Sequence, residues 1–311
     1  MTTNNTSEPD RVLGGVCIFA LVWAAVVFQA GGFTTTIGAG MAFLDWPLSN
    51  GSINPPGWLT NLDMFAEHSH RLAAFKLGII AVGIAVLHLL REPRRGVRLL
   101  AYGLVGLIVI QAGLGGLRVV LDQLNTGAEH NLGGIGFGIA HAVMAQLTVA
   151  TLACLLLVHT RVWHQDALRP SPWAQFLARL APLLLLAVMV AAAVMRQNRV
   201  TLWTSGGDVF IPAVGEGWIW AVNFLHRAGA LLAAAGVIAL AVAGSRSGAP
   251  RALIVTLISA LVLQITLGIL ALGLPQNPHP RTLHVIIGAV LFCSTCSLAL
   301  LLLRAARART S

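Results

Sequence analysis

Eight long apolar segments, joined by short polar ones, determine what this 311-residue chain can fold into. They span about 12–30, 66–90, 97–118, 134–158, 174–194, 218–243, 251–273 and 281–303. Most are close to the roughly 20 residues that an α-helix needs to cross a bilayer. Apolar and polar residues do not alternate with a period of two inside them, which excludes a transmembrane β-barrel. The sequence therefore predicts an all-α membrane protein with eight transmembrane helices.

The composition agrees with a membrane protein. Hydrophobic residues make up 57% of the chain and charged residues only 10%, whereas about a quarter of the residues in soluble domains are charged. The net charge of +9 could suggest nucleic acid as a partner. However, the basic residues lie mostly in short segments between the apolar ones, where they report membrane topology. We therefore exclude a water-soluble enzyme and expect no nucleic-acid partner.

Arginine occurs in alternate connecting segments. The arginines concerned are Arg91, Arg94, Arg95, Arg98, Arg161, Arg169, Arg246, Arg251, Arg304, Arg307 and Arg309. By contrast, residues 31–65, the predicted first outer loop, contain no basic residue, and we expect this long loop to be ordered. The positive-inside rule places the arginine-rich segments and both termini in the cytoplasm. Because the first ten residues resemble no cleaved targeting signal, we expect a multi-pass protein of a bacterial cell inner membrane.

The two halves of the chain share an internal repeat. The motif EHSHR at residues 67–71 is matched by NFLHR at 223–227, and IQAGLG at 110–115 by LQITLG at 263–268. His141 on the fourth predicted helix is matched by His284 on the eighth. Each half crosses the membrane an even number of times, so both have the same orientation. We predict two tandem four-helix bundles with pseudo-two-fold symmetry, formed by residues 1–165 and 166–311.

Four histidines occupy equivalent places in this repeat and approach the outer leaflet: His70, His141, His226 and His284. A histidine inside the membrane is costly, and its structural alternative is a hydrogen bond between helices. Repetition in both halves favours function, because two facing helices that each offer one imidazole can hold a haem iron. There is no cysteine or carboxylate cluster to suggest zinc or a di-iron site. We therefore predict that all four histidines ligate haem iron.

One acidic residue distinguishes the halves. Glu67 lies three residues before His70, hence on the same helical face, whereas Asn223 occupies the matching place before His226. A carboxylate near an iron ligand can take up protons or stabilise positive charge. We therefore expect the first half to be reactive, unless Glu67 only interacts with the helix macrodipole. The neighbouring Arg71 can pair with a haem propionate or with lipid phosphates.

The remaining histidines and the cysteines are weaker candidates. His68 points about 100° away from His70 around the helix, so we assign it no metal. The other histidines are expected at interfaces or on the surface: His88, His130, His159, His164 and His279. All four cysteines lie in apolar segments, where packing explains them, including the CxxC at 293–296.

Taken together, these motifs resemble the haem A synthase family over essentially the whole chain. The resemblance rests on GAGMAFLDWP at 38–47, EHSHR at 67–71, QAGLGGLRV at 111–119, His141, the HR pair at 226–227 and His284. It departs from the family at Leu44, where many members have proline. It also lacks the cysteine pair that some members carry in the first outer loop.

The resemblance implies an oxidoreductase that converts the C8 methyl of haem O to the formyl of haem A by two successive oxidations, for terminal oxidases. It implies a cofactor haem b between His226 and His284, substrate haem O near His70 and His141, and a catalytic Glu67. Arg71 is then a substrate-binding residue. Candidate partners besides haem O and membrane lipid are a haem O synthase and oxidase assembly factors. Two other functions stay open: a dihaem b-type electron-transfer cytochrome, and a haem transporter or chaperone.

Overall fold

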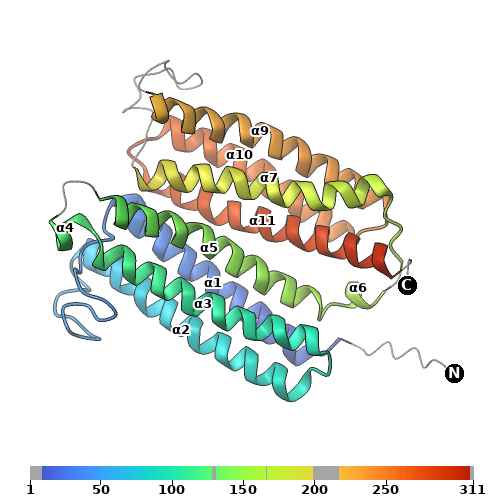
Figure 1. Cartoon of the computed structure of the whole chain (residues 1–311), viewed down its shortest axis with the longest axis horizontal. Helices are drawn as coiled ribbons and strands as arrows, with labels where there is room; N and C mark the ends of the chain where they lie inside the picture. The colour runs from blue at the N-terminus through green and yellow to red at the C-terminus, as the bar shows by residue number, and fades with distance from the viewer. Residues whose placement is uncertain (1–8, 128–130, 166, 199–216, 309–311) are drawn as a thin grey trace.

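The computed structural model describes residues 9–127, 131–165, 167–198 and 217–308, and every regular element in them is a helix. Eight helices are long and apolar enough to span a membrane, which confirms the predicted all-α membrane architecture. They are α1 (Arg11–Ile37), α2 (Leu62–Arg91), α3 (Arg95–Val120), α5 (Leu132–Leu157), α7 (Pro172–Gln197), α9 (Gly217–Arg246), α10 (Arg251–Gly273) and α11 (Pro278–Arg307) (Figure 1). Two short helices, α4 (Gln123–Thr126) and α6 (Arg161–His164), lie in connections.

The long helices pack in two groups of four. In the first, α1 contacts α2, α2 contacts α3, α3 contacts α5 and α5 contacts α1. In the second, α7 contacts α9, α9 contacts α10, α10 contacts α11 and α11 contacts α7. The two groups lie side by side in Figure 1 and meet through α1, α5, α7 and α11.

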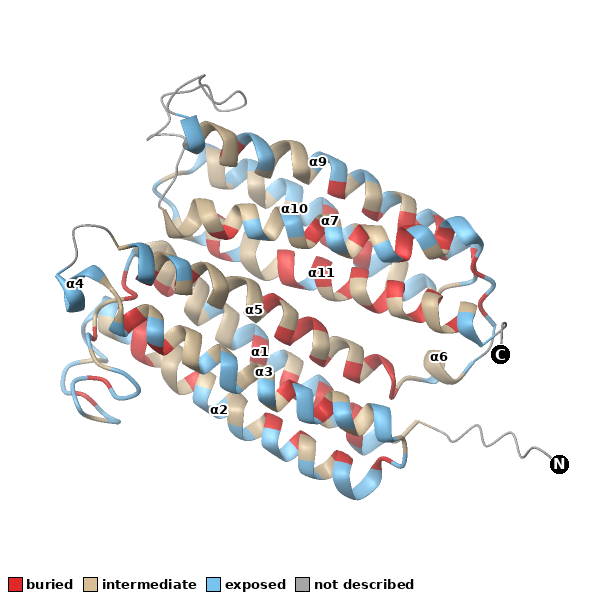
Figure 2. Ribbon diagram, viewed as in Figure 1, coloured by how far each residue is buried: buried red, intermediate tan, exposed pale blue. Residues whose placement is uncertain are grey.

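Helix α11 is the most buried of the long helices. In its most apolar stretch 61% of the residues are buried, against 11–33% in the other spans. The reason is its position, because it contacts α1 and α5 of the first group as well as three helices of its own. Figure 2 shows its buried residues along most of the helix, while many exposed residues lie on α2 and α9. Exposed apolar side chains there suit contact with lipid.

The predicted end of the first helix near residue 30 is wrong. Helix α1 continues to Ile37 because three threonine hydroxyls, at 34–36, each donate to the carbonyl four residues earlier. It ends where Gly38 adopts the left-handed conformation, with φ 81°, which glycine tolerates without a steric penalty. The first connection is therefore shorter than predicted, and Gly31 belongs to a helix.

Contacts with α2 and α3 hold this first connection, residues 38–61. The Asp45 carboxylate accepts hydrogen bonds from the backbone N–H groups of Asn50 and Gly51, at 2.7 Å each. Burial alone would raise the pKa of Asp45, but these two bonds outweigh it and lower the pKa below its ordinary value. On α3, a Cβ added to Gly116 would approach the Trp46 ring to 2.5 Å, so only glycine leaves room for this indole. The loop is thus anchored over one end of the first helix group.

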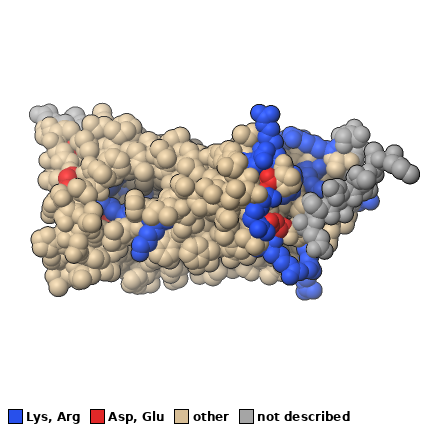
Figure 3. Space-filling model, turned by 90° about the horizontal axis from the view of Figure 1, so that it is seen from below, with Lys and Arg blue, Asp and Glu red and all other residues tan. Residues whose placement is uncertain are grey.

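Basic side chains gather at the opposite end of the molecule. In Figure 3 the lysine and arginine side chains on the visible face lie mostly toward one end of the long axis. Helices α2, α9 and α11 finish there with arginine in their last turns, and α6 lies there too (Figure 1).

Candidate haem-binding sites

The structure brings His70 and His141 together inside the first helix group. His70 comes from α2 and His141 from α5, and their ring centroids lie 6.5 Å apart with the planes at 89°. His70 Nδ1 lies 3.2 Å from the Val27 carbonyl oxygen on α1. His141 Nδ1 lies 3.0 Å from the Gln111 carbonyl oxygen on α3. A carbonyl can only accept, so each Nδ1 carries the proton and each Nε2 offers a lone pair, as a metal ligand requires.

This pair has the spacing needed to hold an iron between two imidazoles. With metal–nitrogen bonds of about 2 Å, two axial imidazoles hold their ring centroids roughly 6 Å apart, close to the separation found here. Glycines make room for both rings, because a Cβ at Gly31 would come within 2.5 Å of His70 and one at Gly115 within 3.0 Å of His141. The residues present therefore fit the iron of a haem.

The second pair occupies equivalent positions in the other helix group. His226 Nδ1, on α9, lies 3.4 Å from the Val188 carbonyl oxygen on α7. His284 Nε2, on α11, lies 3.0 Å from Gln264 Nε2 on α10, and a Cβ at Gly268 would come within 3.3 Å of this ring. The two histidines interact electrostatically. His284 Nδ1 is buried without a hydrogen-bond partner in the described chain, so the ring has a nitrogen to offer a metal.

Glu67 is buried, 4% exposed, and forms an ion pair rather than a helix cap. Helix α2 is capped by Asn61, and its first-turn acidic residue is Asp63, so Glu67 lies beyond the reach of the macrodipole alternative. One carboxylate oxygen accepts from Arg71 at 2.5 Å and the other from the Phe43 N–H at 3.1 Å. The Glu67 carboxylate thus lies between the first histidine site and the outer loop.

Arg71 holds the loop onto α2. Besides Glu67, its guanidinium donates to the carbonyl oxygens of Phe43, Asp45 and Leu48. The predicted pairing of Arg71 with a haem propionate therefore stays a prediction, because the structure shows a different set of partners. At the matching place in the second half, Asn223 is buried and its Nδ2 lacks a hydrogen-bond partner among the described residues.

Two further arginines lie near the histidines and were not predicted as site residues. Arg118 donates to the Gly40 carbonyl at 3.2 Å and interacts electrostatically with both His70 and His141. Arg196 interacts in the same way with His284. The signal that could have identified both is an arginine in the last, outer turn of an apolar helix, where the positive-inside rule disfavours it.

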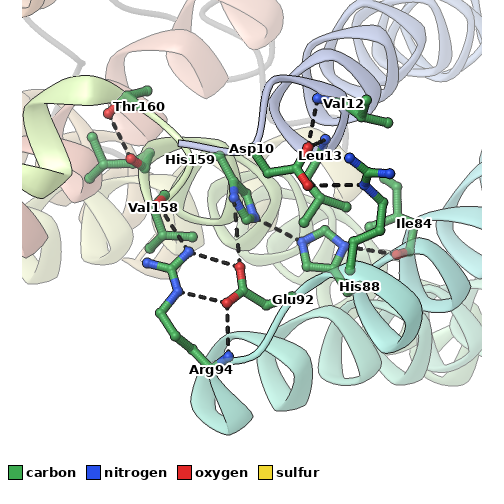
Figure 4. A network of polar contacts seen from close by, with 12 residues as sticks. Asp10, Val12, Leu13, Ile84, His88, Glu92, Arg94, Val158, His159 and Thr160 are labelled. Atoms are coloured by element: carbon green, nitrogen blue, oxygen red, sulfur yellow. Dashed lines mark hydrogen bonds and ion pairs between the residues drawn. The ribbon is translucent and has the colours of Figure 1, made fainter. Parts of the chain in front are cut away.

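His88 and His159 are buried, so their predicted place at an interface or on the surface is wrong. Their exposed fractions are 0% and 5%, and their Nε2 atoms lie 3.0 Å apart (Figure 4). Glu92 lies 3.8 Å from His159 Nδ1 and accepts two side-chain hydrogen bonds from Arg94, at 2.7 and 2.8 Å. This inner cluster of His88, His159, Glu92 and Arg94 joins α2, α3 and the end of α5. His88 is 18 residues from His70 on one helix, about 27 Å away, so the cluster is separate from the haem sites.

The other weak candidates play structural parts. His68 Nδ1 lies 3.0 Å from the Ser49 hydroxyl oxygen, and its ring packs against Trp58. His279 is exposed and stacks on Phe33 at 6.2 Å, His164 is half-buried in α6, and His130 lies outside the described residues. All four cysteines are free. In the described ranges no group of three or more His, Cys, Asp or Glu could hold a bare metal ion.

Comparison with known proteins agrees with the site geometry. The family model described as Cytochrome oxidase assembly protein (COX15-CtaA) matches residues 59–296, which include Glu67 and all four paired histidines. A relative named Heme A synthase, from Caulobacter sp. (strain K31), is 35% identical over 139 residues, or 41% of this chain and 37% of the relative. Another protein of that name, from Bacillus licheniformis, is 26% identical over 250 residues, covering 76% of this chain and 77% of the relative. The alignment to the Caulobacter protein thus spans little more than a third of that protein.

Proposed function

The chain belongs to the COX15-CtaA family of cytochrome oxidase assembly proteins, and from this premise we propose that it is a haem A synthase, an oxidoreductase acting on haem O. The observation that carries the proposal is the asymmetry between two otherwise equivalent histidine sites. The first has a buried carboxylate, Glu67, three residues from a histidine, and the second has the neutral amide of Asn223 there. A reacting site needs such a charge, and a site that only holds a cofactor does not.

In the first site His70 and His141 hold the iron of substrate haem O, so that its C8 methyl is oxidised in place. The first oxidation converts the methyl and one water to an alcohol, releasing two electrons and two protons. The second converts the alcohol and another water to a geminal diol, with the same release, and loss of water gives the formyl of haem A. Each step develops positive charge on the carbon next to the porphyrin, which the Glu67 carboxylate stabilises or deprotonates.

In the second site His226 and His284 are the axial ligands of haem b. When bound, haem b supplies reversible one-electron transfer, which passes the electrons from the first site to an external one-electron acceptor. The neutral acceptors Val188 and Gln264 orient the two imidazoles and fix their ligating nitrogens. No residue equivalent to Glu67 is needed at this site.

The proposal includes the membrane arrangement. Residues 1–165 and 166–311 form tandem bundles with pseudo-two-fold symmetry, which the matching helix contacts in the two groups support. The arginine-rich end and both termini face the cytoplasm of a bacterial cell, with the chain in the inner membrane. Haem O is the substrate partner, membrane lipid surrounds the helices, and a haem O synthase and oxidase assembly factors are candidate protein partners.

Extraction and chromatography of the bound pigments test the function, with a haem O synthase present in the expressing cells. We expect haem B together with haem O or haem A in the wild-type protein. Glu67→Gln should retain haem b but accumulate haem O or the alcohol, because the charge is lost while the shape is kept. Asp63→Asn, an exposed carboxylate on the same helix, is the control and should make haem A normally.

Three outcomes would contradict the proposal in different ways. Two permanent haem B groups and no haem A would indicate an electron-transfer cytochrome, and reversible binding without oxidation would indicate a transporter or chaperone. Near-normal haem A from Glu67→Gln would remove Glu67 from the mechanism. Glu67→Asp keeps the pairing charge for Arg71, so it separates loss of chemistry from loss of the loop anchor. The haem b ligands are tested by His226→Ala and His284→Ala, which should each abolish the low-spin spectrum of the cofactor.

A further inference from the structure

Two arginines at the second histidine site lack a carboxylate partner in the described parts of the chain. Arg196 lies in the last turn of α7, and Arg281 lies near the start of α11. Arg281 precedes His284 by three residues, which places both on one face of the helix. The two guanidinium groups repel each other, and Arg196 also interacts with the His284 ring.

Neither positive charge is neutralised by its neighbours. Arg196 Nη2 donates to the Gly32 carbonyl at 2.5 Å and to the Thr36 hydroxyl at 2.7 Å, both of them uncharged acceptors. Arg281 makes no hydrogen bond in the described structure, and its Nε is buried without a partner. Like charges held together away from water are unfavourable unless an anion joins them. The arrangement therefore indicates a binding place for negative charge beside His284.

We propose that Arg196 and Arg281 bind the propionate carboxylates of the haem held by His226 and His284. This inference rests on the haem b site proposed above. Haem carries both of its carboxylates on one edge, and guanidinium groups bind carboxylates through paired, charge-assisted hydrogen bonds. Arg281 has its donors free in the described structure, and Arg196 keeps donors beyond the one nitrogen that it uses.

The first site differs in this respect. There Arg71 is paired with Glu67 and three loop carbonyls, so its charge is already compensated. The sequence repeat predicted Arg71 and Arg227 as equivalent cations, but the uncompensated charges of the second half come from α7 and α11 instead.

The proposed carboxylate site also lies where the two helix groups meet. Arg196 on α7 donates to two residues of α1, and Thr36 there also accepts from the Thr282 hydroxyl on α11 at 3.2 Å. Thr282 follows Arg281 directly and is fully buried. A propionate held by both arginines would therefore join α7 and α11 next to α1, and haem b would stabilise the contact between the groups.

The decisive variant is Arg281→Gln, because this side chain makes no hydrogen bond in the described structure that its removal would break. We expect the purified holoprotein to keep its low-spin spectrum, since both axial ligands remain. It should transfer haem to excess apomyoglobin at least about tenfold faster, the effect of losing one charge-assisted hydrogen bond. Its midpoint potential should fall, because a positive charge near the haem favours the reduced form. Arg179→Gln, an exposed arginine at the other end of α7, is the matched control.

Two further arms keep the test sharp. Arg196→Lys retains the positive charge but not the fork geometry, so it should release haem faster at a nearly unchanged potential. Haem-stripped wild-type protein should bind haem more tightly than haem dimethyl ester, and Arg281→Gln should lose most of that preference. Release and potential equal to those of Arg179→Gln, or no preference for the free acid in the wild type, would overturn the inference. Failure of the proposed function itself looks different, because the wild type would then hold no haem that depends on His226 and His284.

Discussion

Acidification should destabilise the protein through the buried His159 of the inner cluster. His88 Nδ1 lies 2.8 Å from the Ile84 carbonyl and so carries a proton, which leaves its Nε2 to accept. His159 Nε2 must then donate across the 3.0 Å between the rings. Both imidazoles are neutral in this arrangement, and His159 Nδ1 is buried without a hydrogen-bond partner. Burial, followed by the neighbouring His88, lowers the pKa of His159 from 6.5 to about 4.

The size of the effect follows from the two pKa values of His159. The unfolded chain takes up a proton near its pKa of 6.5, whereas the folded chain resists protonation until about pH 4. Stability is therefore complete above the unfolded pKa and is lost as the pH falls toward the folded one. At pH 5.5 the linkage relation gives a loss of about 1.4 kcal/mol, rising to about 3 kcal/mol near pH 4. For a chain of this size, the loss at pH 5.5 corresponds to a fall in Tm of about 3 °C.

Thermal unfolding of the purified protein in detergent, at pH 7.5 and pH 5.5, measures this effect. Other groups titrate too, so the informative quantity is the fall in Tm of the wild type minus that of His159→Gln, which cannot titrate. We expect the variant to be less stable at pH 7.5 but to lose about 3 °C less on acidification. His279→Gln removes an exposed histidine and should behave as the wild type. The reasoning is refuted if His159→Gln shows the same fall in Tm as the wild type.

Two further predictions concern the first histidine site and the topology. Gly31→Ala should displace the His70 ring, which an added Cβ would approach to 2.5 Å, and lower haem O binding severalfold without changing the haem b spectrum; Gly15→Ala, which has open space on the same helix, is the control, and normal haem O binding in Gly31→Ala would argue against His70 as a ligand. A cysteine at Asn50 should react with an impermeant thiol reagent in intact cells and one at the exposed Ser245 should not; the reverse labelling would place the haem sites on the cytoplasmic side.

The helices were predictable from the sequence because hydrophobic length alone specifies a membrane span. Their ends were less so. The GlyGly pair at 31–32 and the three threonines after it suggest a loop, yet inside a helix those threonine hydroxyls bond to their own backbone and extend α1 to Ile37. Local propensity is a weak guide where side chains satisfy the backbone internally.

The histidine pairs were predictable in part, because the repeat places one histidine at matching depth on each of two neighbouring helices. The contacts between distant segments were not. His88 and His159 are 71 residues apart, and Arg196 donates to Gly32 across 164 residues. Periodicity reports which residues share a face of one helix, but not which face meets which neighbour. The sequence therefore identified the paired histidines and Glu67, and missed Arg196, Arg281 and the inner cluster.

On the proposed assignment, the charges around the two sites also explain why one haem stays and the other leaves. A cofactor must be retained, and the second site offers the uncompensated cations of Arg196 and Arg281 to a ligand that carries two carboxylates. A substrate must be released as product. In the first site the charge of Arg71 is already neutralised by Glu67, so a propionate gains less there. The Glu67 carboxylate also repels other carboxylates and attracts positive charge at the reacting carbon. The carboxylate proposed to assist the oxidation therefore also weakens binding of the anionic haem, which favours turnover in the first half and retention in the second.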